Sequence, residues 1–209
     1  MRKVFLYLYP IKEYASVFTA VKDYIETEQG NPFNILNKCI EKRYKEQDFE
    51  IIVAIYPDKE VYGIDLNLID KLIETDVAFQ EATCYDINGN DKPSEEIKYP
   101  SEKDLFNKIG KVEEIIIAGY HFSDCVKRTA EYFNSRGVDT LVDLELTDLF
   151  FNNYYKEDFC IETYNLALYK QRFMDIFSHY GEFANRQFNK VYGSPIYGFQ
   201  KIEIPKKGK

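Results

Sequence analysis

The sequence EIIIAGYHFSDCVKRTAEYFNSRGVDTLVD, residues 114–143, contains two short apolar runs separated by an amphipathic stretch. The run Ile115–Ala118 is typical of a strand that is buried on both faces. The stretch Ser123–Ser135 predicts a helix, which ends at Gly137. Val138–Leu144 then predicts the next strand. A strand, a helix and a second strand in this order indicate a βαβ unit, whose strands lie parallel in one sheet.

The preceding part of the chain repeats this alternation of strands and helices. The expected strands are Val4–Tyr9, Glu50–Tyr56 and Val77–Asp86, and the expected helices are Glu13–Glu26, Pro32–Tyr44, Ile64–Glu74 and Ser101–Ile109. Beyond residue 148 the pattern predicts a helix at Ile161–Tyr180 and a strand at Tyr197–Ile204. The fold class is therefore α/β, with three layers and a doubly wound, mostly parallel sheet. We expect one domain over residues 1–209, whose part from about residue 150 diverges.

Composition and charge exclude several classes of protein. The chain has 209 residues, 45% of them hydrophobic, and a formal net charge of -8. Nucleic acids and anionic membranes attract clustered basic residues, so we expect neither as a partner. No apolar run reaches the length of a membrane span, and no N-terminal apolar segment resembles a signal peptide, which predicts a cytoplasmic protein. The four cysteines form no CxxC pair, which argues against a zinc site or a disulfide framework.

Cys125 is the candidate nucleophile on chemical grounds. Ligands of an open parallel sheet bind outside the carboxyl ends of its strands, and Gly119 permits a tight turn at such an end. Ser123 is a natural N-cap, which would place Cys125 in the first helical turn. The free amides and the helix dipole there favour a thiolate and could stabilise an oxyanion. The alternative is that Cys125 is an ordinary core residue, since free cysteines are often buried.

The same residues resemble a known family. A strand that ends in Gly119, followed by Cys125-Val126 at the start of a helix, is similar to the nucleophile motif of the isochorismatase-like cysteine hydrolases, which include nicotinamidases. Thr129-Ala130 inside the helix, and Asp143 at the end of the next strand, extend the match. The resemblance covers roughly residues 1 to 150, and it implies the fold expected above and a hydrolase that acts through a cysteine thiolate.

Family members combine the cysteine with a lysine and an aspartate. Lys98 precedes the helix that leads into the nucleophile strand, so the resemblance implies that Lys98 is the catalytic lysine, although a solvated loop lysine is the alternative. The aspartate position at the end of the first strand falls on one of three residues without an acid. These are Tyr7, Leu8 and Tyr9. Glu13 and Asp58 are the nearest candidates for a relocated acid, and ordinary loop carboxylates otherwise.

The resemblance also implies the surroundings of the thiol. The pocket and oxyanion residues would be Tyr9, Tyr120, His121, Phe122, Ser123 and Asp124. A cis peptide bond is implied at Tyr120–His121. Nicotinamidases carry aspartate and histidine after the second strand, but Pro57–Gly63 contains no histidine, so we predict no metal and no other cofactor. Family members commonly form dimers or larger assemblies, which implies a homo-oligomer.

Two functions follow as hypotheses, and a third interpretation competes with both. The first is a cysteine hydrolase that acts on a small amide, ester or related metabolite, with Cys125 as nucleophile and Lys98 as its helper. The second is an inactive relative that binds a small molecule or a protein partner, which the missing aspartate favours. The third is an unrelated α/β domain in which Cys125 belongs to the core.

Overall fold

A computed structural model gives the fold, and it describes residues 2–15, 31–148, 150, 154, 159–165, 167, 168 and 171. Five strands of this part form one sheet in the order β3-β2-β1-β4-β5, and all four strand pairs are parallel. Several predictions concern residues outside this part: most of the helix at Glu13–Glu26, most of the helix at Ile161–Tyr180 and all of the strand at Tyr197–Ile204. The assignment of one domain to residues 1–209 includes such residues too, and it stays a prediction. The α/β class and the doubly wound, parallel sheet are confirmed.

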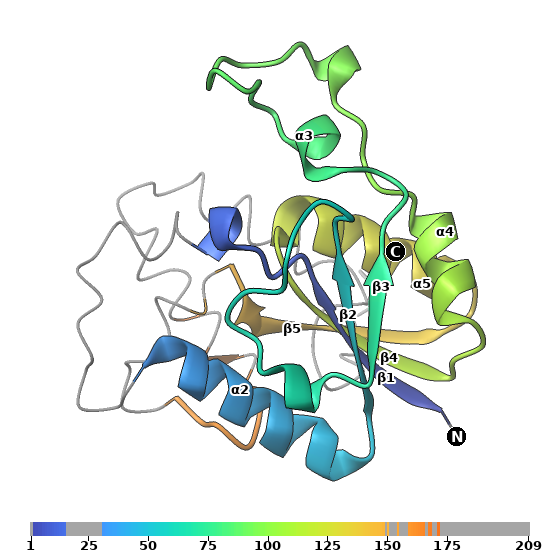
Figure 1. Cartoon of the computed structure of the whole chain (residues 1–209). Coiled ribbons are helices and arrows are strands. Elements are labelled where there is room, and N and C mark those ends of the chain that lie inside the picture. Colours follow the sequence, from blue (N-terminus) through green and yellow to red (C-terminus); the bar gives the residue numbers. More distant parts are fainter. Residues whose placement is uncertain are drawn as a thin grey trace, which may run out of the picture.

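The elements follow one another along the chain as a Rossmann-like series (Figure 1). The strands are β1 (Lys3–Leu8), β2 (Glu50–Ile55), β3 (Lys71–Glu74), β4 (Glu114–Gly119) and β5 (Asp139–Thr147), and the helices are α2 (Pro32–Arg43), α3 (Phe79–Ala82), α4 (Glu102–Ile109), the π-helix η4 (Phe122–Val126) and α5 (Lys127–Ser135). Three short 3-10 turns are η1 (Lys45–Gln47), η2 (Leu66–Leu68) and η3 (Ser94–Glu96). The strand order reverses between β1 and β4, so the switch point of the sheet lies there.

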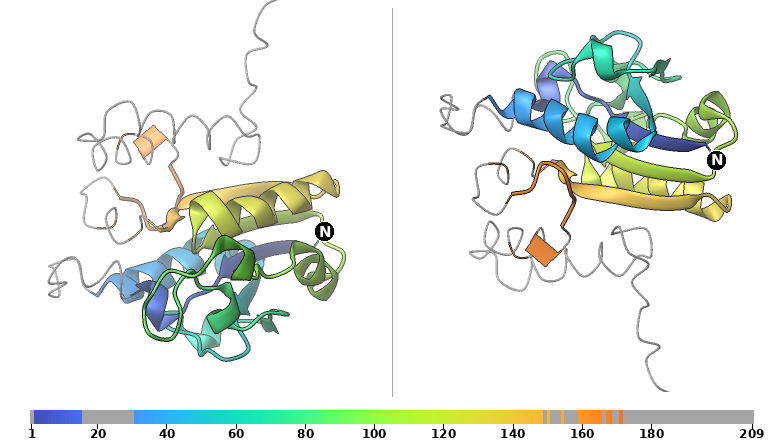
Figure 2. Two further views of the ribbon diagram at one scale, coloured as in Figure 1. Left: turned by 90° about the horizontal axis from the view of Figure 1, so that it is seen from above. Right: turned by 90° about the horizontal axis from the view of Figure 1, so that it is seen from below.

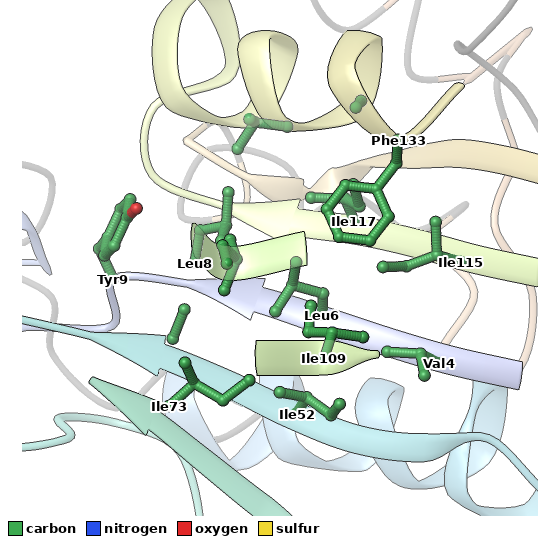
Figure 3. Packing of buried hydrophobic residues seen from close by; sticks show 14 of the residues in the cluster. Val4, Leu6, Leu8, Tyr9, Ile52, Ile73, Ile109, Ile115, Ile117 and Phe133 are labelled. Carbon is green, nitrogen blue, oxygen red and sulfur yellow. The ribbon is translucent and has the colours of Figure 1, made fainter. Parts of the chain in front are cut away.

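The sheet is the middle one of three layers, with α2 on one face and α4 and α5 on the other (Figures 1 and 2). Alternate residues of β1 divide between the two faces. Val4, Leu6 and Leu8 pack in the core under α4 and α5 (Figure 3), whereas Phe5 and Tyr7 pack in the core under α2. Both faces of the central strands are therefore buried, which explains why their sequences are continuous apolar runs.

The predicted helix boundaries are set by local caps. Asn31 accepts a hydrogen bond from the amide of Phe33 over 2.9 Å, and Pro32 follows at the first position of α2. Ser101 accepts one from the amide of Asp104 over 3.2 Å at the start of α4. Each cap satisfies an amide that has no partner within the helix. The predictions for both helices are thereby confirmed.

Two predicted elements between β2 and α4 are wrong. Ile64–Glu74 forms the turn η2 and the edge strand β3 instead of a helix. Asp70 redirects the chain, because its carboxylate accepts from the amide of Ile51 over 2.8 Å and its own amide donates to the carbonyl oxygen of Ile51 over 2.9 Å. Val77–Asp86, predicted as a strand, contains the short helix α3.

Residues 75–101, here named the β3–α4 insertion, stand above the carboxyl ends of β2 and β3 in Figure 1. At the opposite side of the switch point, β5 continues to Thr147, three residues beyond its predicted end. Both features enlarge the structure around the carboxyl edge of the sheet. Within the described ranges, no helix is both long enough and apolar enough to cross a membrane.

Candidate active site

The chain turns sharply where β4 ends at Gly119. The φ angle of Gly119 is +114°, and a Cβ atom built there would lie 2.2 Å from the carbonyl oxygen of Leu8. Only glycine fits such a close approach of two backbones. The amide of Tyr120 donates to the same oxygen over 3.0 Å, and the implied cis peptide bond at Tyr120–His121 is present. The turn delivers His121 to the carboxyl edge of the sheet.

The helix after this turn begins earlier than predicted. His121 is its N-cap, with extended backbone angles, so Ser123 lies inside η4 and the prediction of Ser123 as N-cap is wrong. The amide of Asp124 donates to the carbonyl oxygen of His121 over 3.1 Å. Of the amides expected to stabilise an oxyanion, that of Asp124 is therefore engaged, and those of Phe122, Ser123 and Cys125 are the remaining candidates.

A cavity of about 210 Å³ lies at the carboxyl edge of the sheet, beside η4. Its lining comes from loops after three central strands and from the β3–α4 insertion. The lining residues are Tyr14, Tyr56, Ala82, Thr83, Cys84, Ile97, Tyr99, His121, Asp124 and Cys125. The switch point of an open parallel sheet is where such folds bind ligands, so this cavity is the candidate active site. Among the predicted site residues, it brings together Cys125, His121 and Asp124.

The thiol of Cys125 differs from the expected thiolate. Its pKa is raised to about 12, mainly by burial and next by the charge of Asp124, while Arg128 acts in the opposite direction. The Cys125 Sγ atom lies 3.9 Å from Oδ2 of Asp124. Removal from water and a neighbouring carboxylate disfavour the anion more than the helix start favours it. In the unliganded site the thiol is therefore protonated at neutral pH.

Lys98 does not join Cys125 in the cavity. Its ammonium group forms an ion pair with Glu81, and its side chain is 67% exposed. Its backbone amide also donates to the carbonyl oxygen of Glu81 over 3.0 Å. The neighbours Ile97 and Tyr99 line the cavity, so the backbone of this segment is close to the site while the lysine pairs in solvent.

Tyr9, one of the three residues on which the implied acid position falls, is a buried packing residue. Its ring stacks on Tyr56 with centroids 4.6 Å apart, and its amide donates to the carbonyl oxygen of Ala54 over 2.9 Å. Burial raises the pKa of its hydroxyl well above the ordinary value, with a further contribution from Cys125. Tyr9 and Tyr120 are both nearly inaccessible and do not line the cavity, so they contribute to the site through packing only.

The two candidate relocated acids are engaged elsewhere. Glu13 forms an ion pair with Lys59 over 2.6 Å, and Asp58 accepts from the amide of Phe79 at the start of α3 over 2.8 Å. These contacts are structural, and neither acid lines the cavity. Within the part of the chain that the structure describes, no group of three or more His, Cys, Asp or Glu side chains is placed to hold a metal ion.

A second carboxylate, Asp148, lies beside the cavity. In the pairing of β4 with β5, Gly119 is opposite Thr147, which brings the next residue, Asp148, to the turn after β4. Nδ1 of His121 lies 3.3 Å from Oδ1 of Asp148. Burial lowers the pKa of His121, but contact with the Asp148 carboxylate outweighs it, and the pKa is raised above 6.5.

Sequence reasoning missed Asp148 and the aromatic wall of the cavity. Asp148 was missed because β5 was expected to end at Leu144, four residues earlier. The Tyr14 ring lies 4.6 Å from that of His121, and its hydroxyl is 3.1 Å from that of Tyr56. The available signal was a tyrosine close to a proline that ends a buried apolar run. Tyr14 follows Pro10 by four residues, and Tyr56 directly precedes Pro57.

Comparisons with known proteins give only low similarities, all of them to solved structures. No known family matches the sequence, and no curated protein matches it. Among solved structures, the chain is similar to PnC1 from L. infantum in complex with nicotinate, with 11% identity, a TM-score of 0.41 and coverage of 85% of this chain and 89% of that chain. It is also similar to a protein from Leishmania major that carries the name Mar1 ribonuclease, with 11% identity, a TM-score of 0.43 and coverage of 93% and 85%. At this level of similarity, function has to be argued from the geometry of the site.

Proposed function

We propose that the protein binds a small metabolite in the cavity beside Cys125 and hydrolyses an amide or ester bond of that metabolite. The observation that carries the proposal is that a thiol lines a cavity at the switch point of a parallel sheet, next to the amides at the start of a helix. Cavities for drug-sized ligands have volumes of about 300–1,000 Å³. The volume of about 210 Å³ therefore favours a substrate of few atoms.

The high pKa of Cys125 constrains the reaction. A thiol that is protonated at neutral pH attacks slowly, so its proton has to be removed by a base as the new bond forms. Lys98 is paired with Glu81 in solvent, and Tyr9 supplies no acid at the end of β1. The hydrolase proposed here consequently needs a base that differs from the one implied by the family.

The second candidate function is binding without turnover. It is favoured by the same protonated thiol and by the exposed position of Lys98, because both remove parts of the machinery that the family uses. In that case the cavity holds a ligand, and Cys125 only contacts it. Assembly into a homo-oligomer remains a prediction under either function.

A comparison of Cys125→Ser with the parent protein tests the proposal. Both proteins are screened against small amides and esters, and both ligand-dependent melting temperatures and released products are measured. Cys160→Ser is the matched control, because Cys160 is a half-buried thiol away from the cavity lining. Turnover that Cys125→Ser alone abolishes, with the fold intact, supports hydrolysis.

The other outcomes are equally distinct. Ligands that raise the melting temperature of all three proteins, without product, favour the binding function. A Cys125→Ser protein that melts several degrees lower and binds nothing identifies Cys125 as a core residue, as in the third interpretation.

A further inference from the structure

We infer that His121 is the base that removes the proton of Cys125, and that Asp148 is the positioning residue that orients His121. The inference rests on the proposed function, since it supplies the base that hydrolysis needs. It assigns a catalytic role to a histidine that the sequence placed only in the pocket, and it gives a role to a carboxylate that no motif predicted.

His121 and Cys125 lie close together in the chain and in the fold. His121 is the N-cap of η4, and Cys125 lies one turn later in the same helix. Both side chains line one cavity. A general base has to reach the proton that it removes by a hydrogen bond, directly or through one water. For His121 to act as the base, its Nε2 atom and Sγ of Cys125 have to make such a contact across the cavity that both side chains line.

The imidazole of His121 is oriented by its neighbours. Nδ1 of His121 faces Oδ1 of Asp148 at 3.3 Å, and the side chains are 41% and 12% exposed, respectively. The carboxylate thus lies behind the ring, and a neutral ring that keeps its proton on Nδ1 has its lone pair on Nε2. The T-shaped contact with Tyr14 limits rotation of the ring. Nε2 is the nitrogen left for the cavity.

The charges around His121 and Cys125 favour transfer of the proton to the imidazole. His121 is faced by Asp148 after β5, Asp124 in η4 and the ring of Tyr14. Asp148 is also near the buried hydroxyl groups of Tyr7 and Tyr120.

Cys125 is faced by a different set of groups. They are Asp124, Arg128, Glu102 in α4 and the tyrosines Tyr9, Tyr14 and Tyr56. Arg128 is held by Glu102 and lies 3.7 Å from Asp124. Its charge is therefore largely neutralised, and the two carboxylates that face His121 stabilise the imidazolium formed by proton transfer.

The reaction balances with water as the second substrate. Nε2 takes the proton as the S–H bond breaks, and the sulfur forms a bond to the substrate carbonyl carbon while the C=O electron pair moves to oxygen. The intermediate collapses, the C–N or C–O bond breaks, and the leaving group takes the proton from the imidazolium. Nε2 then deprotonates a water, which attacks the thioester. The C–S bond breaks, the carboxylic acid is released, and the proton on Nε2 returns to the sulfur.

The pH dependence of iodoacetamide alkylation at Cys125 tests the inference without knowledge of the substrate. Rates are measured by peptide mass spectrometry from about pH 5 to about pH 10 for the parent protein, His121→Gln and Asp148→Asn. Asp139→Asn is the matched control, since it removes the same charge from the other end of β5, at an exposed position. Cys160, which does not line the cavity, is the internal reference for alkylation in each sample.

The parent profile should show a shoulder at a pH above 6.5, where His121 loses its proton, followed by the rise of the thiol itself. His121→Gln should lose the shoulder, and its rate near neutral pH should fall at least about tenfold. Asp148→Asn should move the shoulder to lower pH, because loss of the carboxylate lowers the pKa of the imidazole. Asp139→Asn should match the parent.

A parent profile without a shoulder, or a shoulder that survives in folded His121→Gln, overturns the inference. Circular dichroism and melting curves establish folding, and if His121→Gln is unfolded, the shift in Asp148→Asn decides. A shoulder in a protein that hydrolyses nothing would retain the pair and remove the proposed function. Turnover without a shoulder would retain the proposed function and remove the roles assigned to His121 and Asp148.

Discussion

At the scale of single residues, Gly119 has the most restrictive surroundings around the site. A Cβ atom there meets the backbone of Leu8 at 2.2 Å, at a φ angle of +114°. Gly119→Ala should lower the free energy of unfolding by about 3 kcal/mol or more, because a backbone atom of β1 cannot move aside cheaply. Urea unfolding of the purified proteins measures it.

Gly137→Ala is the control for this prediction. Gly137 also has a positive φ, of +81°, but nothing lies within 4 Å of its added Cβ. Gly137→Ala should lower the free energy of unfolding by only about 1 kcal/mol, because only the unfavourable backbone conformation contributes there. Equal losses in the two variants would show that the close approach of β1 and β4 is unimportant.

His121 should make stability depend on pH. Its pKa is raised in the folded protein, so its contribution is fully present below the unfolded value of 6.5 and is lost as the pH rises through the folded value. The ring is 41% exposed, which limits the contribution to under about 1 kcal/mol. Unfolding free energies at about pH 6 and about pH 8.5 should differ less in His121→Gln than in the parent, with the sign just given. An unchanged difference would contradict the ion pair with Asp148.

The sequence predicted part of the site at this scale, and the missing part has physical causes. A glycine after a strand, a cysteine at the start of a helix and the cis bond at Tyr120–His121 are local features, so a short motif could reveal them. The pKa of Cys125 depends instead on burial and on Asp124, and the partner of His121 comes from another strand. Neither can be obtained without the packing of the chain.

At the scale of elements, the β3–α4 insertion depends on a cap from a distant loop. The residue before α3 gives it no side-chain cap, and Asp58 instead accepts from the amide of Phe79 over 2.8 Å. Asp58→Ala should lower the free energy of unfolding by about 1 kcal/mol. It should also loosen Ala82 to Cys84, which line the cavity, and hydrogen exchange of that segment measures this effect.

Glu60→Ala is the control, since Glu60 is an exposed acid of the same loop. It should change stability by less than about 0.5 kcal/mol. Exchange in the insertion that responds equally to both variants would indicate that the net charge of the loop matters and that the Asp58 cap does not.

The central strands were easier to predict from the sequence than the edge strand β3 and the insertion that follows it. β1, β2 and β4 are continuous apolar runs whose neighbours on both faces are helices, so their pattern is strong. β3 is an edge strand of four residues, and Leu72 within it is 51% exposed. Short apolar runs fit a helix and a strand equally well, and here the pairing with β2 decided between them.

At the scale of the whole molecule, Arg43 connects segments that are far apart in the sequence. Its guanidinium contacts Asp143 at 3.0 Å and Glu145 at 2.9 Å, with side chains at most 1% exposed, and its Nε atom donates to the carbonyl oxygen of Ile161 over 3.1 Å. The ring of Phe159 lies 5.6 Å away. Arg43 thus joins α2, β5 and the segment that follows them.

Arg43→Gln should lower the free energy of unfolding by about 3–5 kcal/mol, because it leaves two buried carboxylates without a cation. Lys42→Gln is the matched control, because Lys42 is the neighbouring cation and pairs with Glu46 at the surface. Its replacement should lower the free energy of unfolding by at most about 0.5 kcal/mol. Joint replacement of Arg43, Asp143 and Glu145 by Met, Leu and Leu should recover only part of the loss. It removes the buried charges, but the hydroxyl of Tyr44 and the amide of Leu146 lose Asp143 as their acceptor. If urea unfolding shows equal losses for the two single variants, the network does not hold these segments together. A loss in Arg43→Gln that the triple replacement leaves wholly uncorrected would mean that the fold depends on the hydrogen bonds of this network, to the carbonyl of Ile161 and from the hydroxyl of Tyr44, rather than on its buried charges.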